Sequence, residues 1–436
     1  MLEVKTPTDH GGGVAVADRA PADSIWSQRL PRVDSLTSLR FFAALGVFLT
    51  HVDLYLTVPH ASGLLDLGKV GTTYFIILSG FVLTWTHTNK DTVGWFYWRR
   101  ISRIWPLLVI TALLAVFVMY GPFGTADRPP NLAFWTSSTI FLFQGWLPQN
   151  VFHAPNDVTW TLSAIAFYYL IFPLVARLVE RRTVRQLGLI ALAMLLIGQA
   201  VRVWLWVAFP TMESLQGHIN TAVLAAKSPP GRITEFILGV ALAAMIRKGW
   251  RPRWGKGTAL TLFFALLGGM WLWSAHPEWV GPNHSSIAPT LAIGQVCEVF
   301  LCLLIVAFVC GDLKGKPSLL RSRPLVTLGS WSYAIYLIHV LVLWEISFRV
   351  FGTTSFIGPP PTPAWSHLGL AALAFGIVLV LSWLLYRFVE RPVETALRRA
   401  VRRRRPSGPQ PPESSGPERK PEPQPEPQPE PQPQIA

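Results

Sequence analysis

The sequence predicts an all-α membrane protein, a polytopic helical bundle of about ten transmembrane helices plus one re-entrant or interfacial helix. The 436 residues are 51% hydrophobic and only 14% charged, whereas a soluble domain carries about 25% charged residues. The apolar residues form runs of roughly 20, the length that spans a hydrocarbon core. Nineteen Trp and nine Tyr suit the membrane–water interface, where an amphipathic ring keeps its polar group in water.

Ten apolar runs are predicted to cross the bilayer as helices. They cover residues 36–56, 70–87, 104–120, 158–179, 187–209, 232–247, 257–275, 287–311, 326–350 and 366–387. An eleventh run, 132–147, is short and is interrupted by Gln144, Gly145 and Pro148. We therefore expect this run to be the re-entrant or interfacial helix.

The basic residues between the runs predict the orientation of the bundle. If 132–147 does not span, one face collects nearly all connecting Lys and Arg, and the other holds only Lys69, Arg128 and Lys227 among its loop residues. Lys and Arg accumulate on the cytoplasmic side, so both termini are expected in the cytoplasm. The net charge of +14 has the same origin, and nucleic acid is not expected as a partner.

The two ends of the chain are predicted to be disordered and cytoplasmic. Residues 1–32 contain no apolar segment that could serve as a secretory signal, so the first helix is expected to direct insertion. Residues 397–436 are basic and then rich in Pro, Glu and Gln, a composition that cannot bury a core. Residues 33–396 remain as one membrane domain. Its three cysteines share one apolar run without a metal-binding spacing, so no metal site is predicted.

Ionisable side chains within apolar runs are costly and indicate functional sites. The first run contains Arg40 and, eleven residues later, His51, which places both on one helix face about 16 Å apart along the axis. A neutral histidine is a suitable general base for a hydroxyl group. From composition alone, however, an ordinary interfacial histidine is the preferred interpretation of His51.

Arg100 and Arg103 lie three residues apart before the third run, on one face of a helix just below the predicted bilayer. Two guanidinium groups in this position suit the phosphate oxygens of a ligand. Taken alone, the general accumulation of arginine on the cytoplasmic face explains the pair at least as well.

Polar residues of the later runs allow both structural and functional interpretations. Glu235 is one turn from Arg232; the two can form an ion pair, or Glu235 can orient a catalytic histidine on a neighbouring helix. Tyr333, Tyr336 and His339 share one helix face and are expected to hydrogen-bond between helices, with acceptor binding as the alternative. The segment 390–392, Glu-Arg-Pro, is interpreted as a local ion pair that ends the last helix.

In this order, these motifs resemble those of the membrane-bound acyltransferase 3 family, which O-acylates bacterial surface polysaccharides, Nod factors and macrolides. The resemblance extends over about residues 34–396, and the stretch Leu36–Leu45 looks most like the macrolide-tailoring branch of actinomycetes. The matching segments are Arg40 with His51, Leu78–Phe81, Arg99–Pro106, Trp160–Ser163, Tyr169–Pro173, Glu235–Gly239, Tyr333–His339 and Glu390–Pro392.

The resemblance implies an O-acyltransferase of the plasma membrane that moves an acyl group from acyl-CoA to a hydroxyl of a carbohydrate or macrolide-type acceptor. No bound cofactor is implied, because acyl-CoA is a co-substrate. We expect Arg100 and Arg103, with Arg40, to bind the phosphates of acyl-CoA. His51 is expected to deprotonate the hydroxyl, with Glu235 as its partner.

One residue departs from the family pattern. The family usually reads Trp-Ser-Leu-Ser-Val-Glu, but this chain carries Ile165 where the acid is expected. The acid is then dispensable, or Glu235, Asp157 or Asp53 substitutes for it, or the chain is a catalytically weak family member. A transporter or flippase is the alternative from another class. Such folds often contain internal repeats and paired broken helices, and this sequence has no repeat between its halves.

Overall fold

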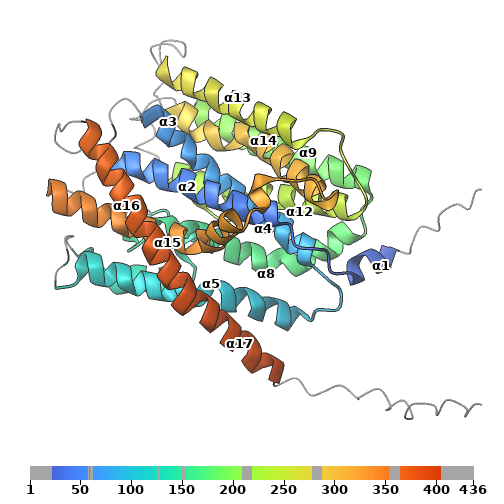
Figure 1. The fold of residues 1–436 in the computed structure, drawn as a ribbon, viewed down its shortest axis with the longest axis horizontal. Coiled ribbons are helices and arrows are strands. Elements are labelled where there is room, and N and C mark those ends of the chain that lie inside the picture. Colours follow the sequence, from blue (N-terminus) through green and yellow to red (C-terminus); the bar gives the residue numbers. More distant parts are fainter. Residues whose placement is uncertain are drawn as a thin grey trace, which may run out of the picture.

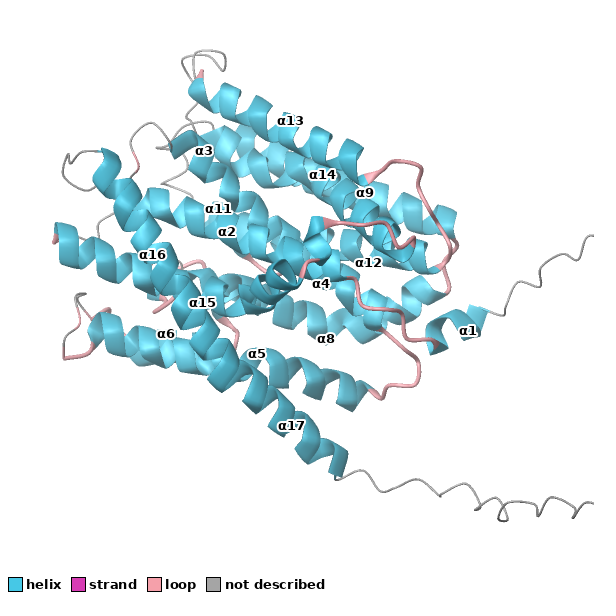
Figure 2. Cartoon of the chain, viewed as in Figure 1, coloured by secondary structure: helices cyan, strands magenta, loops and turns pink. Residues whose placement is uncertain are grey.

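The computed structural model describes residues 22–403, apart from residues 57, 59–61, 123, 125–127, 150–152, 209–218, 277–286 and 353–363. Figures 1 and 2 show long helices running side by side, and no strand occurs within these ranges. The predicted polytopic helical bundle is confirmed.

All ten predicted spans are helices. They are α2 (Asp34–Leu56), α4 (Val70–Thr86), α5 (Val93–Tyr120), α8 (Trp160–Glu180), α9 (Val184–Ala208), α12 (Ile233–Arg247), α13 (Lys256–Ala275), α14 (Ile287–Leu313), α15 (Arg323–Phe351) and α16 (Ala364–Leu385). Within the described ranges, seven stretches are long and apolar enough to cross a membrane, and they contain α2, α4, α5, α8, α9, α15 and α16.

The interrupted run 132–147 forms only short helices. The first, α6 (Leu132–Ile140), has nine residues and is about 13 Å long, too short to span a bilayer. A 3₁₀ turn, η2 (Gln144–Trp146), follows it. Phe141 and Phe143 between them are exposed, which agrees with a re-entrant or interfacial segment.

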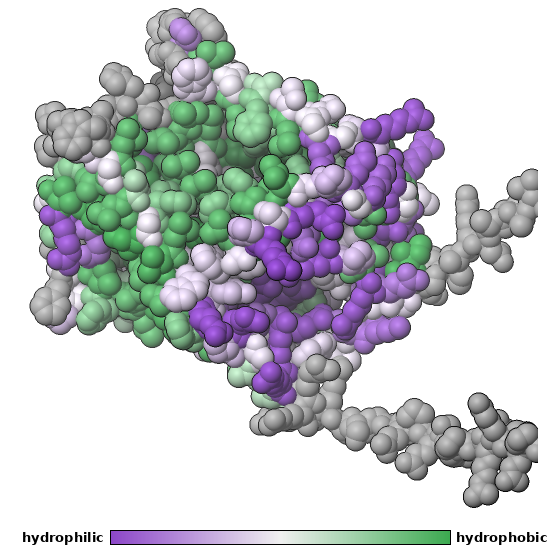
Figure 3. All heavy atoms as spheres, viewed as in Figure 1, coloured by the Kyte–Doolittle hydropathy of each residue, from purple (hydrophilic) through white to green (hydrophobic). Residues whose placement is uncertain are grey.

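The surface has the polarity of a membrane protein. Figure 3 shows apolar residues over most of one face, whereas hydrophilic residues gather at the end where α1 (Ala22–Ser27) and α17 (Arg391–Arg403) lie. We call this end the basic end. Large side chains such as Phe117 and Leu196, 60% and 61% exposed, would be an aggregation hazard in water and suit contact with lipid.

Helices α4 and α12 contact each other backbone to backbone at two glycines. An added Cβ at Gly239 would lie 1.9 Å from the carbonyl oxygen of Ile77, and one at Gly80 would lie 2.1 Å from that of Phe236. Small residues permit such close helix packing in membranes, where apolar burial adds little. Two of the segments that resemble the family, Leu78–Phe81 and Glu235–Gly239, thus meet at one helix crossing.

The prediction of disorder is wrong for residues 22–32, which we call, with Val33, the N-terminal strap. Trp26 in α1 is 2% exposed, and its indole ring lies 4.4 Å from the guanidinium of Arg247. Arg247 also donates to the carbonyls of Ile25 and Gln28. The strap is fixed through its backbone carbonyls, so its polar composition did not predict its order.

The predicted C-terminal boundary is also wrong for residues 397–403. The last span continues through a π-helical turn, η7 (Tyr386–Glu390), into α17. The indole N–H of Trp98 donates to the carbonyl of Leu397 at 2.9 Å, and Arg398 pairs with Glu394. The bond from Trp98 joins α17 to α5, and the Arg398–Glu394 pair lies within α17. Residues 1–21 and 404–436 lie outside the described residues.

Candidate active site

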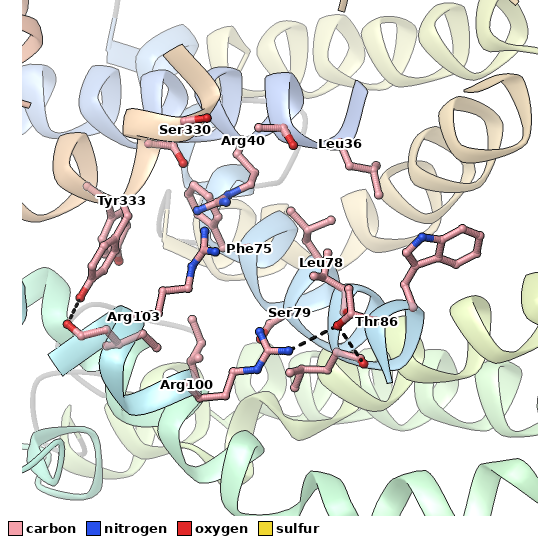
Figure 4. A pocket seen from close by; sticks show the side chains of 18 of the residues that line it. Leu36, Arg40, Phe75, Leu78, Ser79, Thr86, Arg100, Arg103, Ser330 and Tyr333 are labelled. Carbon is pink, nitrogen blue, oxygen red and sulfur yellow. Dashed lines mark hydrogen bonds between the residues drawn. The ribbon is translucent and has the colours of Figure 1, made fainter. Parts of the chain in front are cut away.

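A cavity of about 550 Å³ lies between α2, α4, α5, α8 and α15. Three arginines line it: Arg40 from α2, and Arg100 and Arg103 from α5. Figure 4 shows the guanidinium groups of Arg40 and Arg103 extending toward each other. The residues predicted to bind a phosphate-bearing ligand therefore share one cavity, although the two helices are distant in the sequence.

Arg100 is held in the cavity wall by one hydrogen bond and two aromatic rings. Its guanidinium donates to the Thr86 hydroxyl at 3.3 Å, the bond drawn in Figure 4. It lies 5.5 Å from the ring of Phe96 and 5.7 Å from that of Tyr169. Stacked guanidinium groups retain their remaining N–H donors for an anion.

Glu390 is a cavity residue that sequence reasoning missed. It lies at the end of the π-helical turn, is 5% exposed and lines the cavity. Its carboxylate interacts electrostatically with Arg103 and Arg40, and among the described residues its Oε2 has no hydrogen-bond partner. The helix continues past Pro392, so the interpretation of this motif as a helix stop is wrong.

The strap forms another part of the cavity wall. Leu30, Pro31, Arg32 and Val33 line the cavity, and the carbonyl of Pro31 accepts a 2.9 Å hydrogen bond from Trp85. Because we predicted disorder for this segment, its contribution to a site was not foreseen.

Aromatic and apolar side chains form the inner end of the cavity. Tyr336 donates its hydroxyl proton to the carbonyl of Val158 at 2.9 Å, and the same hydroxyl lies 2.8 Å from that of Thr161. Tyr333 donates to the carbonyl of Ile104 at 2.7 Å. Both tyrosines thus make the bonds between helices that their common helix face predicts.

The two predicted histidines form a pair. Nδ1 of His51 lies 2.8 Å from the carbonyl oxygen of Val47 and 3.4 Å from Nε2 of His339. Nδ1 of His339 lies 3.1 Å from the carbonyl oxygen of Ile335. A carbonyl only accepts, so in both neutral rings Nδ1 carries the proton. In this tautomer the lone pair of the His51 ring is on Nε2.

Asp157 adds a carboxylate near this pair. It interacts electrostatically with His51 and Tyr336, and the neighbouring Asn156 donates to the carbonyl of Leu337 at 2.8 Å. Asp157 also acts on Lys227: burial lowers the pKa of this lysine, and the Asp157 carboxylate opposes that shift. Of the three acids that could replace the absent one, Asp157 therefore has the clearest interaction with His51.

Glu235 forms a buried ion pair with Arg232. Their Oε1 and Nε atoms are 2.6 Å apart, and Glu235 is 0% exposed. Arg232 also donates to the Thr73 hydroxyl at 2.8 Å. These contacts favour the ion-pair interpretation of Glu235 over the catalytic one.

Ile165 lines the same cavity as the three arginines. Together with Thr161, Leu162 and Tyr169 it belongs to the cavity wall. A carboxylate at position 165 would therefore face the cavity that holds the arginines. Its absence changes the charge of the cavity and leaves the histidine pair intact.

The fold and this arrangement define a multi-pass membrane protein with a polar cavity between its helices. The family model described as "Acyltransferase domain" matches residues 33–387, and the chain belongs to that family. The resemblance found in the motifs is confirmed. No solved structure matches the chain.

Among curated proteins, the chain is similar to Acyltransferase MdmB of Streptomyces mycarofaciens. The two are 33% identical over 408 residues, which cover 89% of this chain and 98% of that protein. The chain is also similar to O-acetyltransferase OatA of Staphylococcus aureus, 23% identical over 401 residues, or 85% of this chain and 58% of OatA. The Streptomyces relative agrees with the resemblance of Leu36–Leu45 to the actinomycete branch.

Proposed function

We propose that the protein transfers an acyl group from acyl-CoA to a hydroxyl of a carbohydrate or macrolide-type acceptor at the plasma membrane. The observation that carries the proposal is the cavity that collects Arg40, Arg100 and Arg103 and ends beside the His51–His339 pair. In this proposal the basic end and both chain termini lie in the cytoplasm, where acyl-CoA is available.

The cavity suits acyl-CoA in charge and in length. The arginines would bind its phosphates, with bidentate hydrogen bonds of the kind guanidinium groups form. Thr86, the partner of Arg100, is eleven residues from Phe75 on α4, about 16 Å along the helix axis. From phosphates held at Arg100, an extended pantetheine arm would follow this distance and carry the thioester to the inner end.

His51 would act as the general base. Its Nε2 removes the proton of the acceptor hydroxyl, the oxygen attacks the thioester carbonyl, and the carbon–sulfur bond breaks. The leaving thiolate then takes the proton from His51. During transfer the imidazolium is stabilised by Val47, by Nε2 of His339 and by the charge of Asp157.

The test is acyl transfer from radiolabelled acetyl-CoA and propionyl-CoA in membranes, against a panel of macrolides and bacterial glycans. Loss of a general base lowers rates by ~10² to 10⁴, so His51→Ala should nearly abolish transfer. His153, which stacks on Trp135 at a ring separation of 5.2 Å, provides the control variant His153→Ala. Full activity of His51→Ala would contradict the assignment.

Donor binding has its own test. Arg100→Ala should raise the KM for acyl-CoA with little effect on kcat, because it removes a binding contact distant from the reacting atoms. Arg99→Ala is the matched control, since Arg99 pairs with Asp91 at 2.6 Å. Equal KM values for the two variants would contradict the donor site.

The same assay separates an acyltransferase from a transporter. Purified protein in detergent has no second compartment, so product formation there requires chemistry. Binding of acyl-CoA without any product would favour the weak family member that Ile165 suggests.

A further inference from the structure

We propose that Phe75 determines acyl specificity: its ring closes the inner end of the cavity and limits the acyl groups that reach His51. The inference rests on the proposed function, because it takes this cavity as the site of acyl-CoA. It adds a specificity residue and the property that this residue selects, the size of the acyl group.

The first observation is the position of two aromatic rings between the cavity and the histidine pair. Phe75 and Tyr336 line the cavity, whereas neither His51 nor His339 does. The rings of Phe75 and Tyr336 meet edge to face, with centroids 5.8 Å apart. Tyr336 in turn lies 5.9 Å from His339, and the two histidine rings are 4.9 Å apart. A thioester in the cavity therefore meets this aromatic pair before it meets the base.

The second observation is that the two rings are held differently. Tyr336 is 3% exposed, and its hydroxyl is fixed by Val158 and Thr161. Moving it would leave buried polar groups unsatisfied, at about 1–3 kcal/mol each. Phe75 has no polar atom to satisfy, and a change of rotamer costs it only packing. Phe75 is thus the ring that yields to an incoming acyl group.

The third observation is that Phe75 is an uncharged side chain in a cavity that also holds charged ones. Arg40 and Arg103 line the same cavity, and Figure 4 shows them in the same close view as Phe75. A smaller or larger apolar residue at position 75 therefore changes the room for the acyl group and leaves the charge of the cavity unchanged.

The experiment compares kcat/KM for acetyl-, butyryl- and hexanoyl-CoA in wild type, Phe75→Ala, Phe75→Leu and Phe75→Trp. A single methylene in a hydrophobic pocket changes selectivity by about 10- to 200-fold. Phe75→Ala should therefore raise the hexanoyl-to-acetyl ratio by at least about tenfold, with Phe75→Leu intermediate. Phe75→Trp should lower the butyryl-to-acetyl ratio by a similar factor.

Leu78→Ala is the matched control. Leu78 lines the same cavity on the same helix, three residues or about 4.5 Å nearer the basic end. Its acyl ratios should stay within about threefold of wild type. Size-exclusion chromatography in detergent identifies any variant that fails to fold. If Phe75→Ala fails to fold, the change in the acyl ratio is tested with Phe75→Leu alone.

The outcomes separate this inference from the proposed function. If wild type transfers no acyl group from any acyl-CoA, the proposed function fails. If wild type transfers acyl groups but the ratios do not change in the folded Phe75 variants, only the specificity inference is overturned. Equal changes in Leu78→Ala would also overturn it, because cavity volume alone would then set the selectivity.

Discussion

Nε2 of His339 lies 3.4 Å from Nδ1 of His51, and each ring directs its own Nδ1 to a carbonyl four residues earlier in its helix. His339 therefore offers His51 an acceptor that is uncharged and completely buried. When His51 takes up a proton, this hydrogen bond becomes charge-assisted, a type roughly twice as strong as a neutral one. In the proposed mechanism His339 therefore positions His51, the proposed base.

This geometry predicts the effect of changing His339. His339→Leu should lower kcat by about 10- to 100-fold, the loss of one charge-assisted bond of about 1.5–3 kcal/mol, with an unchanged KM for acyl-CoA. His339→Gln retains an acceptor in a similar position and should recover part of kcat. Steady-state kinetics of both variants provide the measurement. A rise in KM alone, or no recovery in His339→Gln, would assign His339 to packing.

The close crossing of α4 and α12 predicts that an added methyl group at Gly239 destabilises the fold. Gly239→Ala would place a Cβ 1.9 Å from the carbonyl oxygen of Ile77, so α4 and α12 must separate. We expect a loss of about 1–3 kcal/mol and a lower thermal unfolding midpoint in detergent. Gly268→Ala on α13, where an added Cβ meets nothing within 4 Å, is the control. An unchanged midpoint for Gly239→Ala would contradict the crossing.

The hydrogen bonds from Arg247 to the strap predict how fast trypsin cleaves the strap. Arg247→Ala leaves several buried carbonyls unsatisfied, at about 1–3 kcal/mol each, and releases the segment that forms the cavity wall. Trypsin should then cleave after Arg29 or Arg32 much faster than in wild type, and the KM for acyl-CoA should rise.

A neighbouring arginine provides the control for the Arg247→Ala substitution. Arg251 donates to the carbonyls of Ile246 and Trp250, close to it in sequence, so Arg251→Ala should leave the strap protected. Equal cleavage rates in wild type and Arg247→Ala would show that other contacts fix the strap.

Substitutions at position 165 test whether the acid that Ile165 replaces is needed for acyl transfer. Ile165→Glu puts a carboxylate into the wall of the arginine cavity, where it should compete with donor phosphates and raise the KM for acyl-CoA. Ile165→Gln, of equal size and uncharged, should raise it less. Transfer kinetics with both variants measure the difference. A tenfold higher kcat in Ile165→Glu would instead show that the chain is weakened by the absent acid.

The helices could be predicted because each is a run of apolar residues about as long as the hydrocarbon core of a membrane. Arg40 and His51 were found because the helical repeat places them on one face. Glu390 was missed because the helix was expected to stop at Pro392, whereas a π-helical turn carries it on and places Glu390 in the cavity wall.

Contacts between segments that are distant in the sequence produce no periodic pattern in it, so these contacts could not be predicted. His51 meets His339 only when α2 packs against α15, and one sequence cannot show which helices become neighbours. The strap was missed because Arg247 fixes it through backbone carbonyls, which every residue possesses.

The strap also has a consequence for biogenesis. It is synthesised well before Arg247, the residue that holds it, which follows more than 200 residues later. Until α12 has been inserted, the nascent protein lacks one wall of its cavity. If acyl-CoA is the donor, as proposed, a chain that ends before Arg247 would lack a complete binding cavity and would not withdraw acyl-CoA from the cell.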